Sequence, residues 1–241
     1  MGRSRKTISK ELLELLVHRK LSSLMFFGIV GLDALGAVFP EYLNRKITMF
    51  VPFPLLFVLY LLNAEKLNKL FLAALVFNLM GVYNFNNPYG LYNPTGLIYH
   101  TVAYLLYSIV LLQKIKTVRL NKVLKLATVL ILFVAIPLKL WYYEGIKDVF
   151  FFNETLLYII SGTLYVFLAI LTYMTHKTVT GRFLLFSAIS ILLGSYFQGY
   201  NLFINKNDLL NFFAVVSFNL THYLLCCYLV TSEAETIGRN S

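Results

Sequence analysis

The chain has 241 residues, of which 59% are hydrophobic and 13% are charged, and its formal net charge is +10. A soluble domain carries about 25% charged residues, so this composition excludes an ordinary globular protein and indicates a polytopic membrane protein. The basic residues lie in short segments between apolar stretches, where they set membrane topology. We therefore expect membrane lipids, and no nucleic acid, as partners.

The first segment, residues 1–20, combines six Lys or Arg residues with an apolar stripe at helical spacing. This pattern predicts a basic amphipathic helix on an anionic membrane surface. Eight apolar stretches follow, and each is interpreted as a transmembrane helix. They are Leu21–Phe39, Ile47–Asn63, Leu70–Tyr83, Leu97–Gln113, Val123–Trp141, Phe150–Tyr173, Phe183–Phe203 and Leu210–Val230. The sequence thus predicts an all-α transmembrane domain of eight helices over residues 21–230, followed by a cytoplasmic tail over residues 231–241.

The distribution of basic residues supports these spans, because the spans were assigned from hydrophobicity alone. With the N-terminus inside, the inner segments hold 16 Lys and Arg residues and the outer segments hold 5. Cytoplasmic loops of membrane proteins carry such an excess. We expect both termini to lie in the cytoplasm and the protein to reside in a bacterial inner membrane, with an organelle membrane as the alternative.

Ionisable side chains within the spans are candidate catalytic residues. A charge at the centre of a bilayer costs about 2.5–3.5 kcal/mol on insertion scales, so such groups usually face the interior of the bundle and mark functional sites. Asp33, His100, Glu154 and His222 are the candidates, whereas Lys139 can extend to the interface. For Asp33 a cavity role and a structural role are both open, and His222 is also interpreted as a packing histidine.

Other polar side chains predict a pocket between the helices. His100, Tyr104 and Tyr107 follow the i, i+4, i+7 spacing and share one helix face. The predicted pocket-lining residues are Asn78, Tyr83, Asn84, Tyr104, Tyr107, Ser161, Ser190, Gln198, Asn201 and Asn219. The alternative is a set of interhelical hydrogen bonds with an aromatic belt at the interface. The sequence contains no phosphate-binding loop, metal-spaced ligand cluster or nucleophile elbow, so we expect no cofactor and no metal.

Four segments carry a resemblance to a known family. They are LVFNLMGVYNF (Leu75–Phe85), YHTVAYLLYSIVL (Tyr99–Leu111), LLFSAISILLGSYFQGYNLF (Leu184–Phe203) and VVSFNLTHYLL (Val215–Leu225). In order, spacing and span count they resemble helices of the YhhN family of lysoplasmalogenase-like membrane proteins. The family is associated with hydrolysis of the vinyl ether bond of lysoplasmalogens, so the resemblance implies a helical membrane fold and a lipid-like ligand.

The charged positions of that family are replaced in this chain. Two family aspartates fall on Val82 and Ile191, a lysine falls on Phe53, and a histidine falls on Tyr104; only His222 is retained in register. Hydrolysis of a vinyl ether needs a general acid and an anionic group that stabilises an oxocarbenium ion. A valine supplies neither, so the resemblance implies that the family reaction is lost.

Two functions remain as expectations. The first is a non-catalytic protein of YhhN-like fold that binds a lipid-like molecule or serves, with a protein partner, as a subunit of a membrane assembly. The alternative is a lysoplasmalogenase-type hydrolase in which His100 or Glu154 donates the proton, Asp33 stabilises the cation and His222 orients water. Convergence of these groups on one site would favour the hydrolase.

Overall fold

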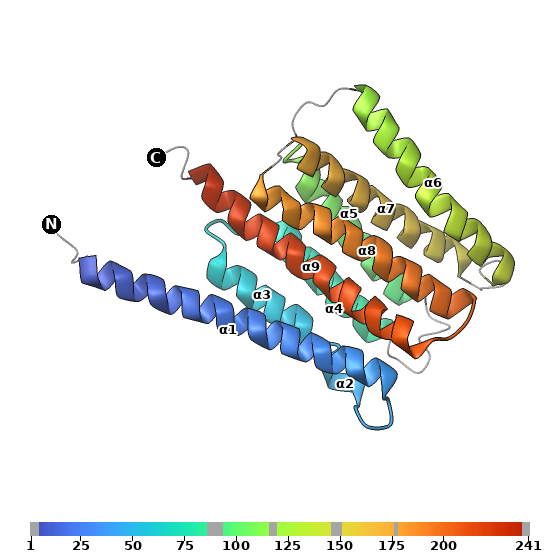
Figure 1. The fold of residues 1–241 in the computed structure, drawn as a ribbon, viewed down its shortest axis with the longest axis horizontal. Coiled ribbons are helices and arrows are strands. Elements are labelled where there is room, and N and C mark those ends of the chain that lie inside the picture. Colours follow the sequence, from blue (N-terminus) through green and yellow to red (C-terminus); the bar gives the residue numbers. More distant parts are fainter. Residues whose placement is uncertain (1–4, 86–93, 116–119, 146–150, 176–177, 238–241) are drawn as a thin grey trace.

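The structure, a computed structural model, describes residues 5–85, 94–115, 120–145, 151–175 and 178–237. Within these ranges every regular element is an α-helix, which confirms the all-α part of the predicted fold class. The helices are α1 (Arg5–Val38), α2 (Arg45–Thr48), α3 (Pro52–Asn63), α4 (Lys69–Phe85), α5 (Thr95–Leu112), α6 (Leu120–Glu144), α7 (Phe152–Thr175), α8 (Val179–Phe203) and α9 (Asp208–Ile237) (Figure 1).

The lengths of these helices match those of membrane spans. In the described part of the chain, seven segments are long and apolar enough to cross a membrane, with α2 and α3 together forming one of them, and α4 is apolar but shorter. This indicates a multi-pass membrane protein. Two helices continue past predicted boundaries: α1 is one helix of 34 residues across residue 20, and α9 extends beyond residue 230.

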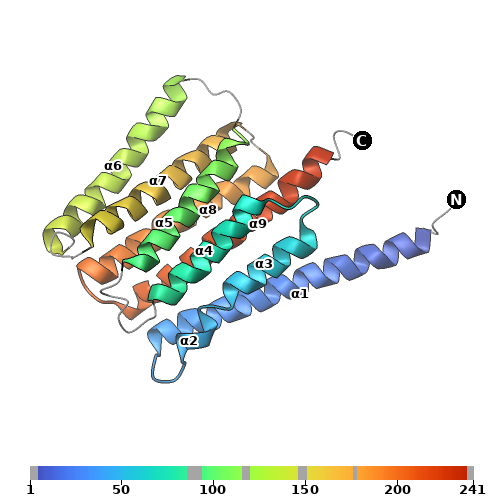
Figure 2. The same cartoon turned by 180° about the vertical axis from the view of Figure 1, so that it is seen from behind.

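Successive long helices run in opposite directions, so that the start of α1 and the end of α9 lie at the same end of the bundle (Figures 1 and 2). The most extensive packing joins α8 to α9 and α4 to α5, and α5 and α8 both pack on α7. At Gly194 a Cβ atom would lie 3.2 Å from the Cβ atom of Ser217. The absence of a side chain there lets α8 approach α9 closely.

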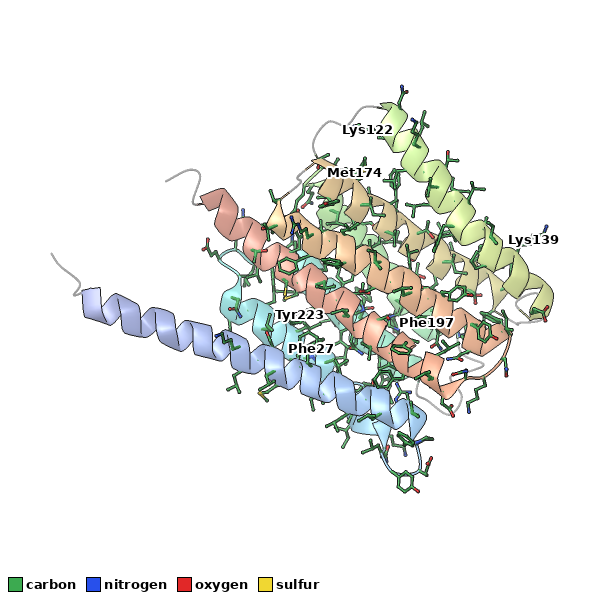
Figure 3. All side chains as sticks on the ribbon, viewed as in Figure 1. Phe27, Lys122, Lys139, Met174, Phe197 and Tyr223 are labelled. Atoms are coloured by element: carbon green, nitrogen blue, oxygen red, sulfur yellow. The ribbon has the colours of Figure 1, made fainter. Side chains whose placement is uncertain are left out.

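The outermost helix of the bundle is α6. It lies at one edge and packs on α7 and α8 (Figures 1 and 2). Only 6% of its membrane-length segment is buried, compared with 56% for α9. Lys122 and Lys139 lie at opposite ends of α6 (Figure 3). Between them α6 presents large apolar side chains such as Ile131 and Ile136 outward, as expected of a helix that faces lipid.

An ion pair fixes the end of α1 against α2. Arg45 donates from Nε to Oδ1 of Asp33 over 2.9 Å and from Nη2 to Oδ2 over 3.4 Å, and the Thr48 hydroxyl donates to Oδ1 over 3.3 Å. The Asp33 side chain is 4% exposed and the Arg45 side chain is 30% exposed. The carboxylate of Asp33 is therefore held by two neighbouring residues of α2, which gives it a structural role.

We expect Arg45→Gln to destabilise the protein, because it leaves the buried Asp33 carboxylate without its cation. Removing one partner of a buried ion pair costs about 3–5 kcal/mol, and the lower end applies here because Arg45 is partly exposed. Thermal unfolding in detergent, followed by circular dichroism, measures the effect. The Asp33→Asn, Arg45→Gln double variant is the control: it should recover much of the loss, and a double variant no more stable than Arg45→Gln would contradict this role.

Candidate functional site

A chain of hydrogen bonds runs through the centre of the bundle. Nδ1 of His100 lies 2.8 Å from Oδ1 of Asn78, Nδ2 of Asn78 lies 3.0 Å from the Tyr107 hydroxyl, and that hydroxyl lies 3.2 Å from Nδ1 of His222. We call these four residues the His100–His222 chain. None is more than 4% exposed. The His100–His222 chain joins α4, α5 and α9 in a region where hydrocarbon and packed side chains exclude water.

The spacing along α5 brings two of these residues to one side. His100, Tyr104 and Tyr107 are all buried, which agrees with the single face predicted for them. Facing them, α4 has a glycine where His100 needs room: a Cβ atom at Gly81 would lie 2.6 Å from Nε2 of His100. The imidazole thus packs directly against the backbone of α4, which places Nδ1 beside Asn78 one turn away.

Aromatic rings surround His222 on several sides. The ring of Phe218 is 4.7 Å away between centroids and nearly perpendicular, Phe53 is 5.3 Å away, and Tyr104 is stacked at 6.2 Å with an interplanar angle of 21°. Sequence analysis did not include Phe53 or Phe218 in the site, because a phenylalanine in an apolar span carries no signal that separates a site wall from ordinary core. Only the fold shows that both rings enclose a histidine.

A cavity of about 60 Å³ lies between α6, α7 and α8. Its apolar wall comprises Phe133, Val134, Pro137, Ile159, Gly162, Val166, Ile191 and Leu192, and its hydroxyl-bearing residues are Tyr104, Tyr158, Thr163, Ser195 and Tyr196. No charged side chain is among these lining residues. A Cβ atom at Gly162 would meet nothing within 4 Å, so this glycine leaves space beside the cavity.

Tyr104 connects the cavity with the centre of the bundle. Its ring packs on His222, and the residue also lines the cavity. Its hydroxyl is buried and has no hydrogen-bond partner among the described residues, and the Tyr158 ring packs beside the Tyr104 ring at 5.8 Å between centroids. A buried hydroxyl without a partner is costly, so this group is a candidate for contact with a ligand.

A second buried network joins α7, α8 and α9. The Ser187 hydroxyl donates to the Thr221 carbonyl oxygen over 2.8 Å, which leaves the Tyr165 hydroxyl to donate to Ser187. All three residues are fully buried. Sequence analysis did not assign Tyr165 or Thr221 to the site, and their hydrogen bonds use up their polar groups within the protein. We interpret this network as structural.

The predicted catalytic residues do not share one hydrogen-bonded set. His100 and His222 belong to the same chain, whereas Asp33 is held by Arg45 and Thr48. Glu154 is partly buried in the first turn of α7, where a carboxylate is favoured by the helix dipole. In the described part of the chain, no group of three or more His, Cys, Asp or Glu side chains is placed to hold a metal ion.

The structure does not bring the predicted pocket-lining residues together in one pocket. Asn78 and Tyr107 belong to the His100–His222 chain, and Tyr104 is the one predicted residue that lines the observed cavity. Side chains that bond to the backbone of their own helix are Asn84, Ser161 and Asn219. Those that are exposed are Tyr83 and Gln198. The remaining two are Asn201, which accepts from the Asn207 N–H in the turn before α9, and Ser190, which is buried on α8.

Comparison with known proteins does not assign this site to a family. No protein-family model, curated protein or solved structure matches the chain. The resemblance to the YhhN family therefore stays a prediction from the four sequence segments, and the site is interpreted from its own chemistry.

We expect Gly81→Ala to disrupt the His100–His222 chain, because the added methyl group would occupy the position of the His100 ring. Overpacking of this kind costs about 1–3 kcal/mol, so the variant should unfold at a lower temperature than the wild type. Gly31→Ala on α1 is the matched control, since a Cβ atom there meets nothing within 4 Å. Equal melting temperatures for the two variants would show that Gly81 is not needed to seat His100.

Proposed function

We propose that this chain is a non-catalytic multi-pass membrane protein that binds an uncharged lipid-like molecule between α6, α7 and α8. The observation that carries the proposal is the cavity itself. It combines apolar walls, several hydroxyl groups and no charged lining residue, and the Tyr104 hydroxyl beside it is buried with no hydrogen-bond partner in the part of the chain that the structure describes. Ligand sites in proteins are typically concave and mostly apolar, with a few polar groups that fix orientation.

The size of the cavity indicates which part of a lipid it accepts. One water-sized group needs about 10–15 Å³ of such volume, so 60 Å³ has room for about four to six water-sized or methylene-sized groups. That is a segment of an acyl or alkyl chain rather than a whole lipid. The remainder of the molecule would extend past α6, which contributes Phe133, Val134 and Pro137 to the wall.

The chemistry of the lining favours a neutral ligand. A charged headgroup or a free carboxylate inside the bundle would need a counter-ion, because burial of an unpaired charge is very unfavourable. The lining offers none, but hydroxyl groups of Tyr104, Tyr158 and Ser195 can donate to a hydroxyl, ether or carbonyl oxygen. The proposed ligand is therefore a neutral lipid, or the neutral portion of one.

The hydrolase alternative receives no comparable support. The Asp33 carboxylate, which would stabilise the cation, already accepts hydrogen bonds from Arg45 and Thr48. His100 is hydrogen-bonded to Asn78, and His222 is hydrogen-bonded to Tyr107. Hydrolysis would require the proton donor, the group that stabilises the cation and the water molecule to converge on the vinyl ether bond.

We expect Gly162→Leu to reduce binding of a neutral lipid, because its side chain would extend into the open space beside the cavity. The measurement is titration of purified protein in nanodiscs with a pyrene-labelled monoacylglycerol, read by fluorescence. Gly28→Leu is the matched control: it adds the same side chain at a glycine of α1 that also has nothing within 4 Å. Loss of affinity in both variants, or in neither, would contradict binding at this cavity.

We expect no aldehyde release when the folded protein is incubated with a lysoplasmalogen. His100→Ala, Glu154→Gln and Asp33→Asn serve as matched variants, because each removes one group that the hydrolase alternative requires. Release by the wild type that one of these variants abolishes would overturn the non-catalytic proposal and identify the residue on which the reaction depends.

The proposed topology is eight spans with both termini in the cytoplasm of a bacterial cell and the bundle in its inner membrane. The 16 to 5 distribution of basic residues supports it, as does the position of the start of α1 and the end of α9 on one side of the bundle.

We expect green fluorescent protein to be fluorescent when it is fused to either terminus in a bacterial host, and alkaline phosphatase to be inactive there. A phosphatase fusion after Lys147, in a proposed outer loop, is the control and should be active. An active phosphatase at either terminus would contradict the topology.

A further inference from the structure

The amide of Asn78 can be oriented from its neighbours. Its Nδ2 atom lies 3.1 Å from the Ala74 carbonyl oxygen and 3.0 Å from the Tyr107 hydroxyl. An amide oxygen at that position would face the carbonyl oxygen and repel it, whereas an amide nitrogen has one hydrogen for each neighbour. The amide oxygen therefore faces His100, and Nδ1 of His100 donates to it over 2.8 Å.

This orientation determines the tautomer of His222. The Tyr107 hydroxyl accepts from Asn78, so its single hydrogen is left for Nδ1 of His222, 3.2 Å away. Because Nδ1 accepts, the imidazole carries its hydrogen on Nε2. His100 and His222 thus adopt opposite tautomers. The amide in the middle also prevents the chain from conducting protons, since an amide group does not relay them as a hydroxyl group does.

The Nε2–H group of His222, at the end of the His100–His222 chain, makes no hydrogen bond with the described residues. Nε2 is buried, and Phe53, Phe218 and Tyr104 pack around the ring. A buried donor that makes no hydrogen bond is destabilising. Phe53 of α3 and Tyr104 of α5, together with Phe218 one turn earlier on α9, hold the ring in place, which argues against an accidental orientation of this donor.

We infer that the Nε2–H group of His222 is a binding site for one neutral oxygen acceptor. The oxygen comes either from a buried water molecule or from the carbonyl or ether group of the lipid-like ligand, and the second source rests on the proposed function. A metal ion does not fit, because the protonated Nε2 offers no lone pair. An anion does not fit either, because the neighbours identified around the ring are aromatic.

The position of Tyr104 supports the lipid-like ligand as the source of the oxygen. Its ring is stacked on His222 and the residue also lines the cavity between α6, α7 and α8, so one side chain adjoins both the imidazole and the cavity. A ligand in the cavity that displaced the Tyr104 ring would gain access to the imidazole of His222. The two unpartnered groups, the Tyr104 hydroxyl and Nε2–H, would then serve the same molecule.

Nuclear magnetic resonance of the imidazole rings tests the inference. The sequence has four histidines, so a His18→Gln, His176→Gln double variant with ¹⁵N-labelled histidine leaves only the two rings of interest. In nanodiscs, long-range ¹⁵N–¹H correlation should show one Nδ1–H ring and one Nε2–H ring. The Nε2 proton should be shifted downfield and should exchange magnetisation with water. His222→Asn, which retains an acceptor for Tyr107, should remove that signal.

Adding a monoacylglycerol with a ¹³C-labelled carbonyl group separates the two sources of oxygen. If the ligand supplies the acceptor, the Nε2 proton loses its water contact and gains one to ¹³C; if water supplies it, the water contact remains, and the site stands even where the Gly162→Leu experiment fails. Two Nδ1–H rings, or an Nε2 proton in contact with neither water nor ¹³C, would overturn the inference.

Discussion

Polar side chains inside this bundle must find their hydrogen-bond partners on neighbouring helices, because hydrocarbon offers none. This constraint explains which helices lie together at the centre. The His100–His222 chain joins α4, α5 and α9, and Ser187 joins α7 and α9 through the Tyr165 hydroxyl and the Thr221 carbonyl. Each network is complete only if three helices meet, so the networks favour one arrangement of the bundle over others of similar apolar burial.

The edge of the bundle contrasts with this centre. The α6 helix packs on α7 and α8 mainly through apolar side chains, and little of it is buried. Apolar packing is less directional than hydrogen bonding, and between lipid-facing helices it has no hydrophobic driving force. A cavity at this boundary is consistent with the weak packing of α6, since a lipid chain can replace contacts between α6 and its neighbours at a small cost in free energy. The proposed ligand therefore enters where the bundle is held least firmly.

Much of the fold follows from the sequence, because hydrophobicity alone locates helices that must lie in a membrane. The shared face of α5 also follows, since the spacing of His100, Tyr104 and Tyr107 allows one interpretation on a helix. The ion pair between Asp33 and Arg45 does not, because it depends on how α2 folds back on α1. The cavity does not follow either: Gly162 and its apolar neighbours look like any lipid-facing stretch until three helices are placed around them.

Photo-crosslinking tests the central claim most directly. A neutral monoacylglycerol with a diazirine in its acyl chain is bound to the protein in nanodiscs and activated by light, and the labelled residues are identified by mass spectrometry. We expect labels on cavity residues such as Val134, Thr163 and Leu192, and competition by the same lipid without the diazirine. Labels that spread evenly over outward residues of α1, such as Leu24 and Met25, and resist competition would contradict a built lipid site.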